Sequence, residues 1–279
     1  MEKIEKIYNF LAYQVEIPKI FGIFHLVSIA VVLLLTIIVC ISCKNSSERT
    51  ERKIAFWVWI ALLILETYKQ FIYHFSTEDG FTLDYSWHGF PFQLCSSPLY
   101  VLPFIAFLPS GKLREAFVAF FGAFVLFGGV VVCAYPGNVF VETLGINFHT
   151  MFWHGSQVVL GVFFNVRRFI SENSPDLIRH FSSSTPIFVT FVSIAEVINN
   201  VFYRFATARG IEDEFNMFFI SSHFECPFPV LNVMQPHVPH AVFIISYVLF
   251  VLLFSFILMA TVASIAKRSR NKKTRKQIF

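Results

Sequence analysis

Charged residues are scarce in this chain of 279 residues. Aspartate, glutamate, lysine and arginine make up 14% of it, whereas a soluble domain carries about a quarter. Hydrophobic residues reach 56%, with 37 phenylalanines among them. This composition excludes an ordinary soluble domain. It indicates an all-α, polytopic membrane protein, because helices satisfy their own backbone hydrogen bonds in lipid.

Cysteine patterns and internal repeats are also missing. The five cysteines have neither the density of a disulfide scaffold nor the paired CxxC spacing of a zinc site. The absence of a repeat argues against an inverted-repeat transporter. Cys226 near the histidines of HFEC and HVPH leaves a metal site as an alternative, but these segments lack a known ligand spacing. We therefore expect no metal and no cofactor.

Seven apolar segments are long enough to span the bilayer, which needs about 20 helical residues each. The segments cover residues 21–42, 54–73, 92–108, 116–134, 148–166, 186–205 and 239–265. The third and fifth are the weakest, because both are short and begin with polar residues. Together they predict one seven-helix transmembrane domain over residues 1–266, followed by a basic tail over residues 267–279.

Lysines and arginines alternate with acidic residues from loop to loop. The loops after the first, third and fifth segments, together with the tail, carry most of the 22 lysines and arginines. The intervening loops are acidic, with residues such as Asp84, Glu142 and Glu212. The positive-inside rule therefore predicts an outer N-terminus and an inner C-terminus. The tail is expected to contact anionic inner-leaflet lipid rather than nucleic acid.

Polar side chains recur in the outer half of several segments. Eight of the nine histidines fall at or near the predicted outer side, and His180 is the exception. Helical spacing places Glu66, Lys69, Gln70 and Tyr73 on one face. The spacing of Glu196, Asn200 and Arg204 does the same in the sixth segment. Charged groups at membrane depth face a cavity or a partner, so Glu66–Lys69 and Glu196–Arg204 are interpreted either as structural pairs or as cavity walls.

The stretch WHGFPFQLCSSP opens the third segment with two prolines. Proline disfavours a regular helix start, and the residue before it is pushed out of the α region. Broken backbone at membrane depth is tolerated where it lines a cavity. Cys95 is therefore expected beside an outward-facing polar cavity, either as a packing residue or as a reactive thiol, with His88 and Gln93 nearby.

Three motifs resemble those of the YwaF-like bacterial integral membrane proteins. They are QLC at Gln93–Cys95 after a proline–aromatic pair, FHTMFWHG at the start of the fifth segment, and the asparagine of FNM. That family is similar to the eukaryotic TMEM-type acyltransferases that remodel ether phospholipids. The resemblance implies Cys95 as nucleophile and His154 as its partner, with Asn216 and His240 as supporting residues, in a bacterial cytoplasmic membrane.

The implied reaction moves acyl chains between phospholipids through a cysteine thioester, for which a histidine must take the thiol proton. His149 is the alternative base; because residues five apart on a helix face directions about 140° apart, only one of the two histidines is expected to face Cys95. Gln93, Asn200 and Asn216 are candidate donors for the oxyanion. Arg204 or Lys69 would meet the lipid phosphate. A carrier or sensor for a small solute or lipid, using the same polar vestibule, is the non-enzymatic alternative.

Overall fold

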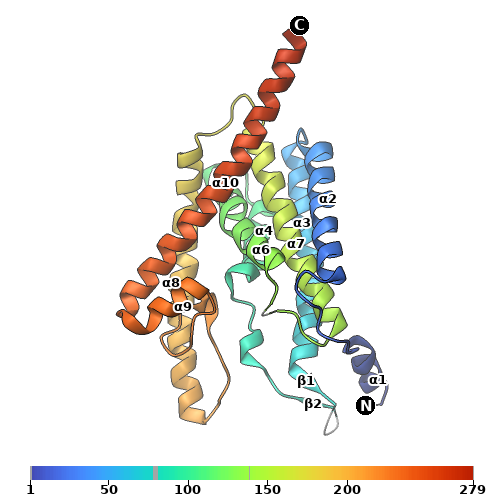
Figure 1. Ribbon diagram of the computed structural model, residues 1–279, viewed down its shortest axis with the longest axis vertical. Coiled ribbons are helices and arrows are strands. Elements are labelled where there is room, and N and C mark those ends of the chain that lie inside the picture. Colours follow the sequence, from blue (N-terminus) through green and yellow to red (C-terminus); the bar gives the residue numbers. More distant parts are fainter. Residues whose placement is uncertain (1, 78–80, 138, 279) are drawn as a thin grey trace.

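The long apolar segments of the sequence fold into helices joined by short loops (Figure 1). The computed structural model describes residues 2–77, 81–137 and 139–278. The α-helices are α1 (Glu2–Leu11), α2 (Ile23–Cys43), α3 (Glu48–His74), α4 (Pro98–Phe107), α5 (Lys112–Phe120), α6 (Leu126–Ala134), α7 (Leu144–Phe169), α8 (Leu177–Arg209), α9 (Pro229–Met234) and α10 (His240–Ile278). Short 3₁₀ turns are η1 (Trp87–Gly89), η2 (Leu94–Ser96), η4 (Met217–Phe219) and η5 (Gln235–His237), and η3 (Phe121–Val125) is a π-helical turn between α5 and α6. Two short strands, β1 (Phe75–Ser76) and β2 (Thr82–Leu83), pair antiparallel.

Five helices of the described residues are long and apolar enough to cross a membrane. They are α2, α3, the continuous run from α5 through α6, α8 and α10 up to Asn271. Each overlaps one of the segments expected from the sequence, with bounds that differ by a few residues. The expected all-α fold is confirmed, and these helices are compatible with an integral membrane protein.

The third and fifth expected segments differ from the other five. The third is broken: α4 has ten residues and follows the two turns η1 and η2. The fifth lies in α7, which has 26 residues and is therefore long enough. However, α7 buries several polar side chains, among them Asn147, Thr150 and Asn165. These two segments fall outside the five because one is short and the other is polar.

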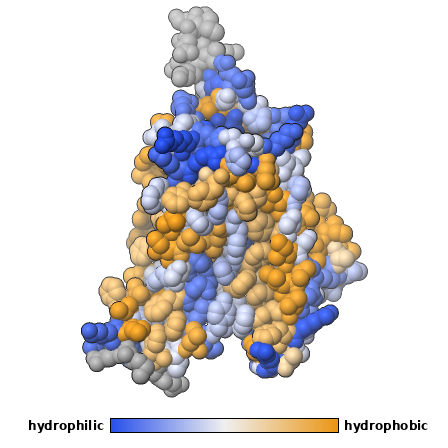
Figure 2. Space-filling model, turned by 180° about the vertical axis from the view of Figure 1, so that it is seen from behind, coloured by the Kyte–Doolittle hydropathy of each residue, from blue (hydrophilic) through white to orange (hydrophobic). Residues whose placement is uncertain are grey.

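The chain ends lie at opposite ends of the bundle, and α10 crosses the bundle obliquely (Figure 1). Residues 267–278 of the expected tail continue α10, and residue 279 lies outside the described residues. Helix α7 lies centrally and packs most extensively against α2 and α6. The face in Figure 2 shows a hydrophilic upper end and a broad hydrophobic band below it, and hydrophilic side chains interrupt the lower part of this band.

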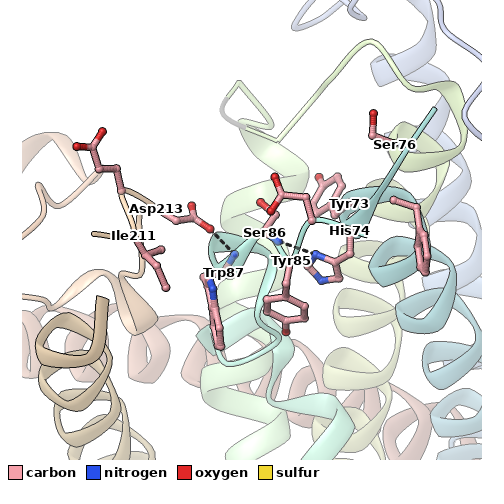
Figure 3. A pocket seen from close by; sticks show the side chains of 11 residues that line it. Tyr73, His74, Ser76, Tyr85, Ser86, Trp87, Ile211 and Asp213 are labelled. Carbon is pink, nitrogen blue, oxygen red and sulfur yellow. Dashed lines mark hydrogen bonds between the residues drawn. The ribbon is translucent and has the colours of Figure 1, made fainter. Parts of the chain in front are cut away.

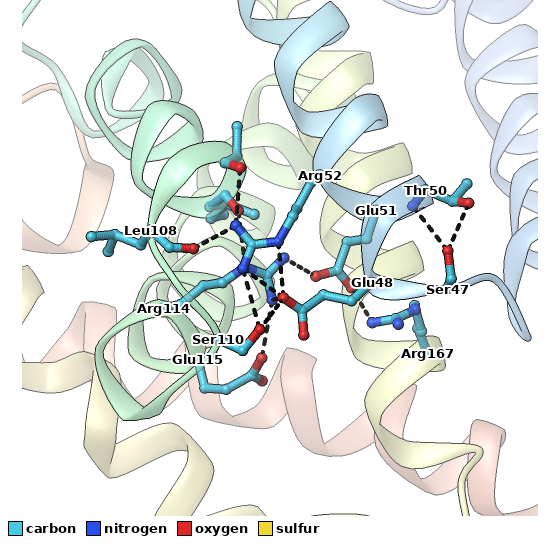
Figure 4. A network of polar contacts seen from close by, with 12 residues as sticks. Ser47, Glu48, Thr50, Glu51, Arg52, Leu108, Ser110, Arg114, Glu115 and Arg167 are labelled. Carbon is cyan, nitrogen blue, oxygen red and sulfur yellow. Dashed lines mark hydrogen bonds and ion pairs between the residues drawn. The ribbon is translucent and has the colours of Figure 1, made fainter.

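A network of buried ion pairs joins α3, α5 and α7 at the end where α10 terminates (Figures 1 and 4). Glu51 is completely buried and accepts hydrogen bonds from three arginines. Arg114 Nη2 and Arg167 Nη1 lie 2.5 Å from its two carboxylate oxygens, and Arg168 contacts both oxygens. Arg168 also pairs with Glu115 at 2.7 Å. These arginines, which the sequence places in loops, instead fasten three helices together.

Gly129 allows α6 to approach α7 closely. A Cβ at this position would lie 2.7 Å from Gln157 Cβ and 2.8 Å from the His154 carbonyl oxygen. We expect Gly129→Ala to cost about 1–3 kcal/mol of stability, because the helices must separate. Thermal unfolding in detergent checks this. Gly111→Ala is the matched control, since nothing lies within 4 Å of a Cβ there, and an equal loss in both variants would contradict the packing role.

Candidate functional site

A cavity of about 620 Å³ lies between the end of α3, the turns η1 and η2, the first half of α7 and the loop that follows α8. Seven of the site residues expected from the sequence line it. They are Glu66, His88, Gln93, Cys95, His149, His154 and Asn216. The structure thus brings the expected cysteine and both candidate histidines to one cavity.

The prolines shape the segment that carries Cys95. Phe90, before Pro91, has ψ 128°, as expected for a residue that precedes proline. Ser97, before Pro98, is instead α-helical with φ −56° and ψ −24°, so the expectation for this residue is wrong. Its backbone N–H and its hydroxyl both donate to the Leu94 carbonyl, which continues η2 into α4. Pro98 then occupies the first turn of α4, where its missing N–H costs nothing.

Two side chains of α7 hold the backbone of Cys95. Trp153 Nε1 and Gln157 Nε2 each donate to the Cys95 carbonyl oxygen at 2.7 Å. Cys95 itself is a free thiol. The two bonds fix this residue against α7 while it lines the cavity.

Gln157→Met removes one of these two donors with little change in volume. We expect it to cost about 0.5–1.5 kcal/mol of stability, the usual contribution of one hydrogen bond. It should also change the alkylation rate of Cys95, because the backbone there is less constrained. Thermal unfolding and the rate of maleimide labelling at Cys95 check both effects. Gln14→Met, at an exposed position outside the cavity lining, is a control that should leave the Cys95 rate unchanged; equal labelling rates in all three proteins would contradict the positioning role.

The tautomer of His154 follows from its hydrogen bond. Its Nδ1 lies 2.7 Å from the Thr150 carbonyl oxygen. A carbonyl oxygen only accepts, so Nδ1 carries the proton and Nε2 of the neutral ring is left as an acceptor. This Nε2 is buried and has no hydrogen-bond partner among the described residues. His154 therefore brings an unprotonated, unpartnered nitrogen to the cavity wall.

His149 lines the same cavity as His154, and which of the two rings faces Cys95 stays a prediction. The cavity borders a wide arc of α7, from Ile146 to His154, and this arc includes directions 140° apart. The His149 ring stacks on Trp153, with centroids 5.1 Å apart. Its Nε2 is buried and, within the described part of the chain, has no hydrogen-bond partner.

One face of α3 forms the charged wall of the cavity. Lys69 Nζ lies 2.8 Å from Glu66 Oε1. Gln70 Nε2 donates both to Glu66 and to the Gly89 carbonyl, and so ties α3 to η1. Tyr73 lines the cavity from the same face. The face predicted from helical spacing is present, and it serves both as a structural pair and as a cavity wall.

The loop after α8 forms the opposite wall. Asn199 of α8 clamps Met217, accepting from its N–H at 2.8 Å and donating to its carbonyl at 3.0 Å. Phe218 and Phe219 both have φ near +58°, which is costly for residues with a side chain. Gln93 Nε2 donates to the Asn216 carbonyl at 2.8 Å. This amide group is therefore committed to the loop, which argues against its expected role as an oxyanion donor.

The Asn216 side chain also serves the loop. Its Oδ1 accepts from the Ser221 N–H at 3.0 Å, and its Nδ2 donates to the Glu225 carbonyl at 3.1 Å. His88 is more peripheral: its Nδ1 lies 2.7 Å from the Ser86 hydroxyl. Both residues line the cavity, but their polar groups are used to hold its rim together.

Four expected site residues do not line the cavity: Glu196, Asn200, Arg204 and His240. Glu196 Oε1 accepts from Asn200 Nδ2 at 2.8 Å and lies 3.0 Å from His240 Nε2. The partner of Glu196 across helices is thus His240, and the predicted pairing with Arg204 is wrong because Arg204 is exposed to the surroundings. Asn200 is consequently no oxyanion donor, and the cavity cation is Lys69.

A second cleft, also of about 620 Å³, opens beside this cavity and shares Tyr73 with it (Figure 3). In this cleft the Trp87 N–H donates to Asp213, and the Ser86 N–H donates to His74 Nδ1 at 2.9 Å. His74 Nε2 is bound to Gln70. Both nitrogens of this histidine are therefore used for structure, as are those of His25, which contact the Phe21 N–H and the Cys133 carbonyl.

Sequence reasoning missed Thr150 and Trp153 as parts of the site. Trp153 lies one turn from both His149 and Gln157, so the spacing of four residues along α7 was the available signal. Across the described residues, no group of three or more histidine, cysteine, aspartate or glutamate side chains could hold a metal ion.

No family model, curated protein or solved structure matches this chain. The resemblance to the YwaF-like proteins therefore stays an expectation based on the motifs around Gln93, Cys95 and His154.

Proposed function

We propose that this protein is a membrane acyltransferase or transacylase that moves acyl chains between phospholipids through a thioester on Cys95. The observation that supports this most is that one cavity is lined both by the free thiol of Cys95 and by His154, whose Nε2 is unprotonated and has no hydrogen-bond partner among the described residues. A cysteine nucleophile needs such a base to become a thiolate.

In the proposed reaction His154 Nε2 first takes the proton of the Cys95 thiol. The thiolate attacks the ester carbonyl of a donor phospholipid, the ester C–O bond breaks, and His154 returns the proton to the departing lysolipid oxygen. A thioester remains on Cys95. The hydroxyl of an acceptor lysolipid then attacks the thioester carbonyl while His154 takes its proton. The thioester C–S bond breaks, the acyl chain leaves on the acceptor as an ester, and His154 returns the proton to the Cys95 thiolate.

Lys69 is proposed to receive the lipid phosphate. Its ammonium has three donors. Among the described residues that line the cavity, Lys69 is the only lysine or arginine. Glu66 holds it in place at 2.8 Å. The His149 ring, in the tautomer that protonates Nε2, is the proposed donor to the oxyanion of the tetrahedral intermediate.

The proposal includes seven spans with an outer N-terminus and an inner C-terminus. The five apolar helices would be joined by α7 and by the broken segment that ends in α4. Chain ends on opposite sides of the bundle support an odd number of spans (Figure 1). The distribution of lysines and arginines gives the direction. The cavity would then open toward the outer leaflet of a bacterial cytoplasmic membrane, and the basic end of α10 would contact anionic lipid inside.

The test is acyl transfer in proteoliposomes that contain a phospholipid with a labelled acyl chain and an unlabelled lysophospholipid. The wild-type protein is expected to move label to the lysophospholipid, and Cys95→Ala to abolish the transfer. Cys40→Ala, on the half-exposed side of α2, is the matched control and should retain it. Transfer that persists in Cys95→Ala would refute the proposal.

A carrier or sensor is the second candidate, supported by the Glu66–Lys69 pair inside the cavity. Ionisable groups at membrane depth often mark a pathway for solutes. Under this alternative, Glu66→Gln would abolish solute binding or uptake while Cys95→Ala stayed active. Under the acyltransferase proposal Cys95→Ala abolishes activity and Glu66→Gln has the smaller effect, so the two variants distinguish the candidates.

A further inference from the structure

Helix α1 presents apolar side chains that no described residue covers. Ile4, Ile7 and Phe10 are 47%, 55% and 80% exposed. They are spaced three residues apart and therefore lie along one side of the helix. Glu5 and Asn9 lie on the opposite side, because successive residues of a helix are about 100° apart. Lys3 falls between Ile7 and Phe10 on the helical wheel, where a lysine can extend its ammonium to the headgroups while its stem stays in apolar surroundings. An amphipathic helix of this kind is typical of segments that lie in the membrane surface.

One edge of the apolar side of α1 packs on the rest of the protein, and the other edge is the exposed flank formed by Ile4, Ile7 and Phe10. Tyr8 makes edge contacts with Phe71 and Phe81, with centroids 5.7 and 6.2 Å apart. The Tyr68 hydroxyl donates to the Leu11 carbonyl at 2.9 Å. Helix α1 is therefore fixed to the end of α3, and its exposed flank has a defined direction.

The exposed flank lies next to the hydrophobic band of the bundle. Eleven residues separate α1 from α2. Phe21, just before α2, is 62% exposed, and Ile23 and Leu26 in its first turn are 85% and 51% exposed. Figure 1 shows α1 at the lower end of α2 and α3. This is the end of α3 that carries Tyr73 and the cavity. Helix α1 thus lies beside helices that are long and apolar enough to cross the bilayer.

We propose that α1 is an interfacial helix whose Ile4, Ile7 and Phe10 insert at the boundary between lipid headgroups and acyl chains, in the leaflet that the cavity faces. The occupant of this surface is the bilayer itself. Its position beside the exposed apolar side chains at the start of α2 supports the bilayer over a second protein copy. The assignment is independent of the acyltransferase proposal.

Backbone hydrogen bonds connect the segment after α1 to the start of α7, which lines the cavity. The Val15 N–H donates to the Glu142 carbonyl at 2.7 Å, and the Leu144 N–H donates to the Tyr13 carbonyl at 2.9 Å. Leu144 begins α7, the helix that carries His149 and His154. An α1 bound to lipid would therefore fix the depth of the first turns of α7 relative to the headgroups.

The test places a photoreactive p-benzoyl-phenylalanine at position 10 and, as the matched control, at position 9 on the polar side. Both proteins are irradiated in vesicles of phosphatidylethanolamine and phosphatidylglycerol that contain an alkyne-tagged phospholipid. Position 10 is expected to yield at least about fivefold more lipid adduct than position 9, because only the apolar side enters the acyl region. Ile7 provides a second position, expected to behave like Phe10.

Three outcomes would overturn the proposal. Equal lipid adducts at positions 9 and 10 would mean that α1 has no preferred side. An absence of lipid adducts at both positions 7 and 10 would place the flank in water. Protein–protein adducts that exceed lipid adducts at position 10 would assign this surface to a second copy of the chain. None of these results depends on acyl-transfer activity.

Discussion

Glu51→Ala is expected to cost about 3–5 kcal/mol of folding free energy, because removing one partner leaves buried opposite charges uncompensated. Glu51 is fully buried and binds Arg114, Arg167 and Arg168. These three arginines come from α5 and α7, so the loss would loosen two helices from α3 at once. Thermal or denaturant-induced unfolding of the detergent-purified protein measures the effect.

Glu48→Ala provides the matched control for this prediction. The Glu48 side chain is 37% exposed and pairs with Arg52 one turn away in α3. Exposed pairs of this kind contribute about 0–1 kcal/mol. A loss in Glu51→Ala no larger than that in Glu48→Ala would mean that the buried network does not hold the bundle together.

His154→Gln is expected to lower the rate of acyl transfer about 10²–10⁴-fold, the usual contribution of a general base. The reason is the bond from His154 Nδ1 to the Thr150 carbonyl, which leaves Nε2 as the unprotonated nitrogen at the cavity. Glutamine can keep the hydrogen bond to Thr150 but cannot take the thiol proton. Initial rates in proteoliposomes measure the effect.

His149→Gln and His180→Gln separate the base from other roles. His149 shares the cavity, so its loss should reduce the rate by less than that of His154. His180 packs on Phe169 at the far end of α7 and should have little influence. Equal rate losses in His149→Gln and His154→Gln would contradict the assignment of a single base.

The helical architecture was predictable because it depends on local patterns. Each of the five helices suited to a membrane coincides with an apolar run of the sequence. The break before α4 was likewise predictable, since Pro91 and Pro98 restrict the backbone around Cys95. The exception at Ser97 arose because its hydroxyl bonds to Leu94, a contact that steric rules for proline do not include.

The side-chain pairings were harder to predict because they join distant helices. Arg114 and Glu51 are 63 residues apart, and loop charge counts gave no sign that they meet inside the bundle. Glu196 binds His240, which is 44 residues away, and leaves Arg204 exposed, although spacing within α8 favoured Arg204. Periodicity defines which residues share a face of a helix, but not which other helix that face meets.

The same limit applies to the two histidines of α7. A helical wheel correctly separates His149 and His154 by about 140°. It does not reveal how much of α7 the cavity borders, because that depends on the loop around Met217 and on the end of α3. Motif spacing thus located Cys95 and both histidines, whereas the tautomer of His154 required the contact with Thr150.

The most direct test of the central proposal is the capture of an acyl group on Cys95. The purified protein is incubated with a phospholipid that bears an alkyne-tagged acyl chain, quenched in acid and analysed by peptide mass spectrometry. We predict a tagged acyl group on the peptide that contains Cys95, released by neutral hydroxylamine as expected for a thioester, and absent from Cys95→Ser. Equal labelling of wild-type protein and Cys95→Ser would contradict the proposed mechanism.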